Sequence, residues 1–336
     1  MKGKILVTGA GGFIGSVATY LLLKADYNVV AVDNFVTGYH EPLVSLSDKF
    51  GPDRLTTVEL DLQKDLSPLF ENHPDIEAVL HYAASCLVDE SMSTPEKYFK
   101  NNIGSTLNLV ENLVKYNIPR IIFSSTCAVY GEAQYVPVDE KHPIVPSNPY
   151  GESKRIAESI IQWMGRLKGL QYVILRYFNV CGASDDGLIG DSKKPSTLLM
   201  QNAVRGALGI EPFALTCPEV DTPDKTPIRD YINVVDLNTA HIKALEYLSS
   251  GGSSEIINLG TGHGNSVLEI VDMVKQKTGA TFDLTKGQPR AGEYAKMIAS
   301  IEKAGSVLGW KPERTLEQSV ESLITWYKTH PNGWER

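Results

Sequence analysis

The sequence predicts an α/β fold, a doubly wound parallel sheet of the Rossmann type with a smaller, interleaved C-terminal domain. Three observations lead to this prediction. Short apolar runs alternate with longer amphipathic runs, the first apolar run enters a helix through a glycine-rich turn, and small, polar or acidic residues follow each run. This alternation is typical of parallel strands whose connecting helices cover both faces of a sheet.

The first predicted strand, Lys4–Thr8, leads through the turn Gly9-Ala10-Gly11-Gly12-Phe13-Ile14-Gly15 into an apolar helix at Ser16–Leu23. Glycines at positions 9, 12 and 15 allow a tight turn and let backbone N–H groups approach a pyrophosphate at the helix N-terminus. We therefore expect a dinucleotide to bind here. The alternative is an ordinary turn between a strand and a helix.

The second predicted strand, Tyr27–Asp33, ends on a carboxylate. A carboxylate at this position accepts hydrogen bonds from the two ribose hydroxyls and repels a 2′-phosphate. Asp33 therefore favours NAD over NADP, although a solvated aspartate at a strand end would look the same in the sequence.

Further alternation extends the predicted sheet. A helix is expected around Pro95–Tyr116, and strands are expected at Leu55–Leu60, Ala78–Tyr82, Arg120–Ser125 and Tyr172–Arg176. Ligands of such sheets bind beyond the carboxyl ends of the strands. Those ends carry Asp61-Leu62, Ala83-Ala84-Ser85 and Ser124-Ser125-Thr126.

The stretch from Asn148 to Lys154 carries the candidate chemistry. Tyr150 and Lys154 are four residues apart on a predicted helix that continues to Leu167, so they share one face. Free tyrosine has a pKa of about 10, and a neighbouring cationic lysine favours the phenolate. Such a pair can take a proton from a sugar or alcohol hydroxyl and return it. The alternative is a core tyrosine beside a solvated lysine.

Composition narrows the possible partners. The chain has 336 residues and a net charge of −8 without a basic run, which argues against nucleic acid or an anionic membrane surface. No apolar run approaches the roughly 20 residues of a membrane span, and no signal-peptide pattern opens the chain, so we expect a cytoplasmic protein. No metal site is expected, because neither the histidines nor the four cysteines have metal-ligand spacing.

The second half of the chain is expected to hold substrate. We predict an NAD-binding domain at residues 1–180 and a substrate domain at 181–336, with a strand near 256–260 rejoining the main sheet. Amphipathic helices are expected at Leu198–Ala207 and Asn238–Leu248. The segments Asp191–Thr197 and Thr216–Pro227 are rich in Pro, Asp and Thr, and they are expected to cover the substrate.

Assembled in order, these motifs resemble the extended short-chain dehydrogenase/reductase family, and within it the UDP-glucose 4-epimerases, over nearly the whole chain. The landmarks are Thr8–Gly15, Val32-Asp33-Asn34, His81–Ala84, Asn101-Asn102, Ser124–Thr126, Val129-Tyr130-Gly131, Pro149–Lys154, Leu175–Asn179, Arg229–Val234, Asn258–Gly262, Arg290–Glu293 and Leu308–Pro312.

The resemblance implies an NAD-dependent isomerase of galactose metabolism that inverts C4 of a UDP-hexose through a transient 4-keto sugar and forms a homodimer. It implies catalytic roles for Thr126, Tyr150 and Lys154. The implied NAD contacts are Gly9, Gly12, Phe13, Ile14, Gly15, Asp33, Asn34, Phe35, Thr37, Gly38, Asp61, Leu62, Tyr82, Ala83, Ala84, Ser85, Asn101, Ser124, Tyr150, Lys154 and Phe178. The implied UDP-sugar contacts are Ser125, Thr126, Tyr150, Asn179, Thr197, Leu198, Arg229, Arg290, Glu293 and Met297.

Three positions depart from the epimerase pattern. Cys86 stands where a lysine is sometimes found, Ser196-Thr197 replaces paired asparagines, and the aromatic residue expected near Leu215-Thr216 to stack on uracil is missing. Phe213 is the candidate substitute. The alternatives are an epimerase for UDP-N-acetylhexosamines or UDP-pentoses, a nucleotide-sugar dehydratase or decarboxylase, and a non-catalytic sensor of NAD or nucleotide sugar.

Overall fold

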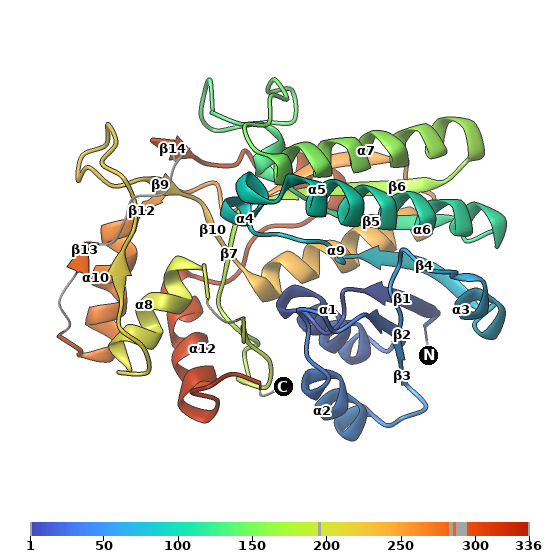
Figure 1. Ribbon diagram of the computed structural model, residues 1–336, viewed down its shortest axis with the longest axis horizontal. Helices are drawn as coiled ribbons and strands as arrows, with labels where there is room; N and C mark the ends of the chain where they lie inside the picture. The colour runs from blue at the N-terminus through green and yellow to red at the C-terminus, as the bar shows by residue number, and fades with distance from the viewer. Residues whose placement is uncertain (1, 194–195, 282–284, 287–293, 335–336) are drawn as a thin grey trace. The chain divides into compact units, whose positions relative to one another are not determined.

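The computed structural model describes residues 2–193, 196–281, 285–286 and 294–334 (Figure 1). The chain forms two compact units that exchange segments along the sequence. The first comprises Met1–Gly131, Ile144–Arg176 and Asn238–Ile257, and the second comprises Glu132–Pro143, Tyr177–Leu237 and Asn258–Arg336. Among the described residues, no helix is both long and apolar enough to cross a membrane.

A seven-stranded sheet with the order β11-β6-β5-β4-β1-β2-β3 forms the centre of the first unit. Pairing is parallel from β1 to β2 and β4, from β2 to β3, and from β4 to β5. The strands are β1 Lys4–Thr8, β2 Asn28–Asp33, β3 Leu55–Glu59, β4 Ile76–His81, β5 Arg120–Thr126, β6 Gln171–Tyr177 and β11 Glu255–Leu259. The predicted doubly wound α/β fold is therefore confirmed.

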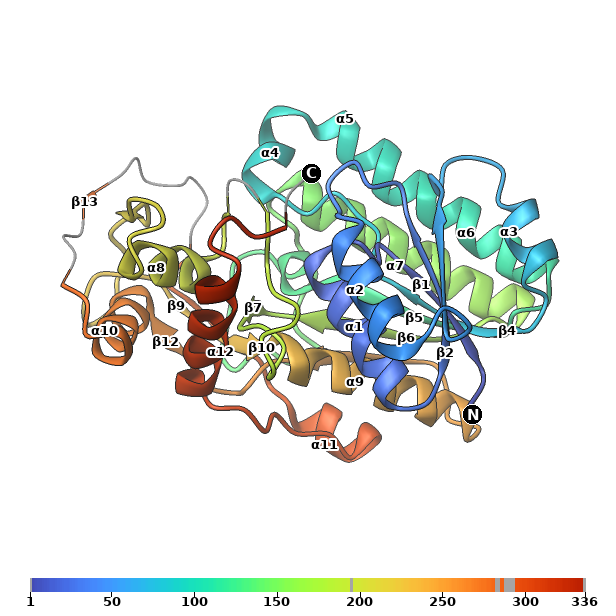
Figure 2. The same ribbon diagram turned by 90° about the horizontal axis from the view of Figure 1, so that it is seen from below.

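Helices cover both faces of this sheet, as Figures 1 and 2 show. Helices α1 (Phe13–Lys24), α2 (Glu41–Phe50) and α9 (Val234–Ser249) lie on one face, and α3 (Ser67–Asn72), α6 (Gly104–Lys115) and α7 (Pro149–Lys168) lie on the other. Apolar side chains from strands and helices share one core, exemplified by Leu6, Ile121, Leu109 and Ile161, which are fully buried. Strand-length apolar runs fit this burial on both faces.

The predicted helix Pro95–Tyr116 is interrupted in the structure. It consists of α5 (Pro95–Tyr98), a π-helical turn at Phe99–Ile103 and α6, and a further short helix, α4 (Val88–Ser93), precedes it. The π-helical turn carries Asn102, whose buried amide binds the backbone of Ser85 on both sides and donates to the hydroxyl of Ser153 at 2.9 Å. Hydrophobic periodicity carries no signal for such a turn, because the turn depends on partners distant in sequence.

In the part of the second unit that the structure describes, small sheets pack with helices. Strand β7 (Asn179–Cys181) pairs with β10 (Tyr231–Asn233), and β9 (Ile228–Arg229) lies between β12 (Asn265–Ser266) and β14 (Lys296–Met297). A third small sheet joins β8 (Ala214–Leu215) to β13 (Thr285–Lys286). The helices are α8 Leu199–Ala207, α10 Val267–Thr278, α11 Glu302–Leu308 and α12 Leu316–Thr329.

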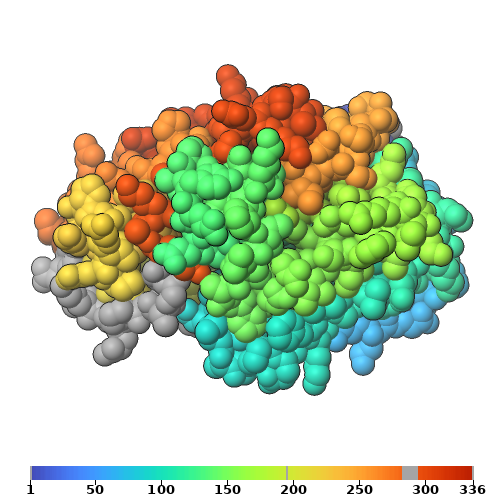
Figure 3. Space-filling view, turned by 90° about the horizontal axis from the view of Figure 1, so that it is seen from above, coloured from blue at the N-terminus to red at the C-terminus, as the bar shows by residue number. Residues whose placement is uncertain are grey.

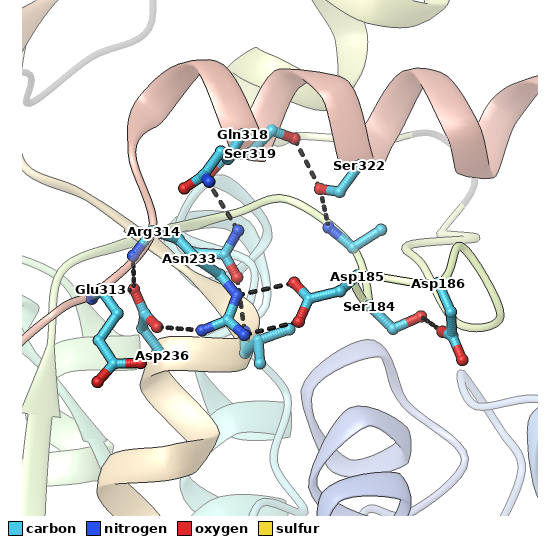
Figure 4. A network of polar contacts seen from close by, with 12 residues as sticks. Ser184, Asp185, Asp186, Asn233, Asp236, Glu313, Arg314, Gln318, Ser319 and Ser322 are labelled. Atoms are coloured by element: carbon cyan, nitrogen blue, oxygen red, sulfur yellow. Dashed lines mark hydrogen bonds and ion pairs between the residues drawn. The ribbon is translucent and has the colours of Figure 1, made fainter.

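A polar network fixes the start of α12 (Figure 4). The guanidinium of Arg314 donates to both oxygens of Asp185, at 2.7 and 2.6 Å, and to Asp236 at 2.5 Å. Asn233 donates to Ser319 at 2.9 Å, while Ser322 accepts the N–H of Ala183 at 3.0 Å. These contacts tie the last helix to β10 and to the segment that follows β7.

A buried ion pair joins α7 to β6 within the first unit. Arg176 donates to both carboxylate oxygens of Glu158, at 3.0 and 2.6 Å, and both side chains are only 2% exposed. The same carboxylate accepts the hydroxyl of Ser125 at 2.5 Å, and Arg176 also donates to the hydroxyl of Tyr130 at 3.1 Å. The pair therefore links α7, β5 and β6.

Replacing Arg176 should destabilise the protein strongly. Arg176→Met leaves the Glu158 carboxylate buried without its cation, so the free energy of unfolding should fall by about 3–5 kcal/mol in urea denaturation. Arg155→Met removes an arginine–glutamate pair from the same helix, but that pair is exposed to solvent, so this control should cost less than about 1 kcal/mol. Equal losses in both variants would contradict the assignment of a special role to the buried pair.

Candidate active site

The glycine-rich turn forms a cradle that side chains would fill. Gly9 has a φ of +70°, in the left-handed region that favours glycine. A Cβ atom on Gly15 would lie 2.1 Å from the carbonyl oxygen of Gly9, so helix α1 can approach the turn only with glycine there. This close packing directs the start of α1 at the edge of the sheet where β1 ends, which fits the expected pyrophosphate site.

Asp33 is held rigidly at the end of β2. Its two oxygens accept the N–H groups of Gly11 at 2.9 Å and Phe35 at 2.8 Å. Burial raises the pKa of this carboxyl, and the backbone donors oppose the shift. The carboxylate, with about four lone-pair sites, still has capacity to accept a ribose hydroxyl. A Cβ on Gly38 would contact both oxygens at 3.0 Å, so the loop after β2 closes tightly over Asp33.

The other predicted cofactor residues of the first unit lie near the ends of its strands. Asn101 donates to the hydroxyl of Ser85 at 3.2 Å and accepts from Gln63, whose N–H binds Asp61. Asn238, which the sequence did not indicate, accepts the hydroxyl of Tyr82 at 2.8 Å and donates to the carbonyl of Ile14. The remaining residues lie at the start of α1 (Phe13, Ile14), after β2 (Asn34, Phe35, Thr37), after β3 (Leu62), and after β4 (Ala83, Ala84).

Phe178 belongs to the second unit. It lies between β6 and β7, is buried, and donates its N–H to the carbonyl of Leu259.

Helix α7 begins at the candidate catalytic tyrosine. The side chain of Asn148 caps the helix by accepting the N–H of Gly151 at 2.8 Å, and Pro149 occupies the first turn. A Cβ on Gly151 would lie 2.5 Å from the carbonyl oxygen of Ala128, so the helix starts directly against the turn that follows Thr126. The hydroxyl of Thr126 accepts the N–H of Ala128 at 3.1 Å, which leaves its own hydrogen for another acceptor.

Lys154 points inward and is 3% exposed. Its Nζ donates to the carbonyl oxygen of Ser124 at 2.8 Å and lies 4.7 Å from the ring centroid of Phe123. Burial lowers the pKa of Lys154 to about 8, while Cys86 and Glu158 act in the opposite direction. Tyr150 is also buried, and the ring of Tyr98 meets it edge-on at a centroid distance of 6.3 Å.

Two buried groups, Glu158 and His81, belong to the surroundings of this site although the sequence analysis did not assign them to it. Ser125, expected to contact substrate, is fully buried and donates its hydroxyl to Glu158 instead. His81 is fully buried between the hydroxyls of Thr8 and Thr106, and burial lowers its pKa to about 3. The histidine is therefore neutral, and it forms part of the structural floor. Glu158 could have been suspected, because it lies one helical turn after Lys154.

The second unit has a pocket of about 110 Å³. Its wall includes four predicted substrate residues, Asn179, Thr197, Leu198 and Arg229, together with Phe213, the candidate uracil-stacking residue. Leu215, Thr216 and Cys217 complete one side. A mostly neutral wall with one arginine suits a nucleotide, because the base needs an apolar surface and the diphosphate needs a cation.

Three predicted substrate residues remain, Met297, Arg290 and Glu293. Met297 is 5% exposed and lies in β14, where it pairs with Arg229, and within the described residues it is not part of the pocket wall. Arg290 and Glu293 lie outside the described residues.

Comparison with known proteins identifies the family. The profile of the "NAD dependent epimerase/dehydratase family" matches residues 5–260. A UDP-glucose 4-epimerase of Lacticaseibacillus casei is 41% identical over 335 residues, covering 98% of each chain. UDP-arabinose 4-epimerase 1 of Arabidopsis thaliana is 37% identical, covering 98% of this chain and 80% of that protein.

Solved structures agree with the sequence comparison. The crystal structure of a UDP-glucose 4-epimerase from Bifidobacterium longum in complex with NAD+ and UDP superposes with a TM-score of 0.93. It shares 33% identity, and the match covers 98% of this chain and 100% of that one. The predicted resemblance to UDP-glucose 4-epimerases of the extended short-chain dehydrogenase/reductase family is thus confirmed. The chain belongs to the NAD dependent epimerase/dehydratase family.

Proposed function

We propose that the protein uses NAD to invert C4 of a UDP-hexose, interconverting UDP-glucose and UDP-galactose through a transient 4-keto sugar. The observation that carries this proposal is the arrangement of Tyr150 and Lys154 at the start of α7, packed against the end of β5. This arrangement lies in the same unit as a glycine turn shaped for a pyrophosphate. The identity to UDP-glucose 4-epimerases over the full chain supports it.

In the proposed reaction, Tyr150 takes the proton of the sugar 4-hydroxyl, and Thr126 donates or relays a hydrogen bond between them. Lys154, held by Ser124, places a positive charge beside the tyrosine and favours its anionic form. NAD, when bound, accepts the hydride from C4 and returns it to the opposite face of the same sugar carbon. Tyr150 then gives the proton back, so the chain itself is unchanged after each turnover.

We propose that the two functions are divided along the chain. In this division, residues 1–180 bind NAD and residues 181–336 bind the UDP-sugar. Thr197, Leu198, Phe213 and Arg229 form the nucleotide pocket together with Asn179, which stands just before the boundary. The pocket of the second unit supports this division. The cytoplasmic location stays a prediction from the sequence.

A UDP-pentose is the second candidate substrate. The relative from Arabidopsis thaliana that supports it is named a UDP-arabinose 4-epimerase, and it is nearly as similar as the glucose enzymes. A dehydratase is disfavoured, because the two positions after Thr126 are Cys127 and Ala128. Neither position carries a carboxylic acid that could protonate a departing 6-hydroxyl.

Tyr150→Phe tests the proposed base. The ring remains, so folding and NAD binding should survive, while turnover of UDP-galactose should fall by at least about 10²–10⁴-fold. Tyr116→Phe, which removes another hydroxyl from the same unit, should keep full activity. Product analysis by NMR should show UDP-glucose as the only new compound, in equilibrium with the remaining UDP-galactose. Near-normal activity of Tyr150→Phe, or accumulation of a 4-keto-6-deoxy sugar in the wild type, would refute the proposal.

Met297 should limit how large a substituent on C2 of the sugar the site can accept. Methionine is unbranched and adaptable, so we expect a preference for hexoses with weaker N-acetylhexosamine activity, by about 10- to 200-fold in kcat/KM. Met297→Tyr should suppress the N-acetyl activity and spare the hexose activity. Its burial favours the competing interpretation, core packing. Equal loss of both activities together with a lower Tm would establish that interpretation.

We also propose that α6 and α7 form the interface of a homodimer. The two helices pack side by side, and their outer surfaces expose Leu107 (38%), Trp163 (57%) and Leu167 (71%). Figure 3 looks onto the surface that carries α7. Large apolar side chains on adjacent helices suit a self-complementary contact between two copies.

The double variant Trp163→Glu/Leu167→Glu tests this interface. Two carboxylates in a buried interface would be unpaired, so the variant should sediment as a monomer in analytical ultracentrifugation. Val44→Glu changes an equally exposed valine on α2 and should leave the association unchanged. A double variant that sediments as the wild type does would rule out this face.

A further inference from the structure

Asp230 is a fully buried carboxylate at the centre of the second unit, and the reaction proposed above does not use it. It follows β9 directly and precedes β10, so its backbone lies between Arg229 and the strand that pairs with β7 (Figure 1). Burial raises the pKa of Asp230, and hydrogen bonds from its neighbours oppose that shift.

Four uncharged donors surround the carboxylate. Oδ1 accepts the N–H and the hydroxyl of Thr261, both at 2.7 Å. Oδ2 accepts the N–H groups of Gly262 at 3.0 Å and Ala299 at 3.2 Å. The approach is close, because a Cβ on Gly260 would lie 2.4 Å from Oδ2. Hydrogen bonds to a charged acceptor are stronger than neutral ones, so this set fixes two loops around one side chain.

The backbone of Asp230 also forms hydrogen bonds that hold neighbouring segments of the second unit together. Its N–H donates to the carbonyl of Met297 at 3.1 Å, and its carbonyl accepts the N–H of Asn179 at 3.0 Å. Ala299 lies two residues beyond Met297, so the side chain and the backbone of Asp230 both hold the segment that contains β14. Asn179 and Arg229 line the pocket, and Met297 pairs with Arg229. Each of the three is bonded to Asp230 or adjacent to it.

We propose that Asp230 is a positioning residue for the nucleotide sugar: its carboxylate fixes the relative places of Asn179, Arg229 and Met297. This inference rests on the proposed function, because the ligand it concerns is the UDP-sugar. Asp230 itself touches no reacting atom. It acts through the β9–β14 pair and the turn at Thr261-Gly262, so its loss should weaken binding of the nucleotide and leave the chemical step nearly intact.

The chemistry of the site requires a carboxylate and not merely its shape. An asparagine has the same size, but its amide presents one oxygen and one NH₂ group. In one orientation the NH₂ group faces the N–H groups of Gly262 and Ala299. In the other it faces the N–H and hydroxyl of Thr261. Either orientation sets donors against donors, so the two loops must move apart.

The experiment compares Asp230→Asn with the wild type in the full-length protein. Calorimetric titration with UDP should show affinity at least about tenfold weaker, since hydrogen bonds to charged groups are worth about 1.5–3 kcal/mol each. The KM for UDP-galactose should rise similarly, while kcat should change by less than about threefold. Loss of uniform binding gives this pattern. NAD affinity should be unchanged, because every predicted NAD contact except Phe178 belongs to the first unit.

Two further variants keep the test decisive. Thr261→Val removes the hydroxyl that donates to Asp230 and that accepts the N–H of His263 at the exposed end of the turn. It should weaken UDP binding about two- to tenfold in a protein that folds, even if Asp230→Asn does not. Asp236→Asn is the matched control. Asp236 is also buried in the second unit and also accepts two backbone N–H groups, but from Glu313 and Arg314. Asp236→Asn should lower the Tm without changing the affinity for UDP.

The outcomes separate this inference from the proposed function. If the wild type binds UDP and epimerises UDP-galactose, unchanged UDP affinity in folded Asp230→Asn or in Thr261→Val overturns the positioning role. A fall in kcat at constant KM would overturn it as well. If the wild type neither binds UDP nor acts on UDP-galactose, the proposed function fails, and the inference fails with it.

Discussion

The buried pair between Glu158 and Arg176 is the constraint on which the candidate catalytic site depends. It ties the helix that carries Tyr150 and Lys154 to two adjacent strands, and through Ser125 it fixes the end of β5. The residues on either side of Ser125 are Ser124, which accepts from Lys154, and Thr126. Because two buried charges are costly unless each satisfies the other, the geometry of this pair permits little movement.

The buried carboxylate of Asp230 in the second unit is stabilised by hydrogen-bond donors instead of a cation. Asp230 is as deeply buried as Glu158, but backbone N–H groups and a hydroxyl surround it. The guanidinium of Arg176 reaches a neighbouring helix through its long side chain. Backbone N–H donors can bond Asp230 only if the backbone itself comes close to the carboxylate. Glycine at 260 permits that approach. The first arrangement therefore fixes strands and a helix, and the second fixes loops that carry ligand-binding residues.

Local pattern was sufficient to predict the sheet and the catalytic helix. Apolar runs located β1 and β2 within a residue, and the cap and proline at Asn148-Pro149 located the start of α7. The sequence could not show what depends on distant partners. Contacts between segments far apart in the chain produce the π-helical turn around Asn102, the inward hydroxyl of Ser125 and the set of donors around Asp230. The burial of Met297 has the same origin.

The central claim is that a hydrogen leaves C4 and returns to C4 of the same sugar. The most direct measurement follows UDP-galactose labelled with deuterium at C4, converted by the purified protein in ordinary water and examined by NMR and mass spectrometry. Oxidation to the ketone and reduction within one bound complex predict UDP-glucose with the label fully retained at C4. Loss of the label to solvent would indicate proton abstraction at carbon and would contradict the account.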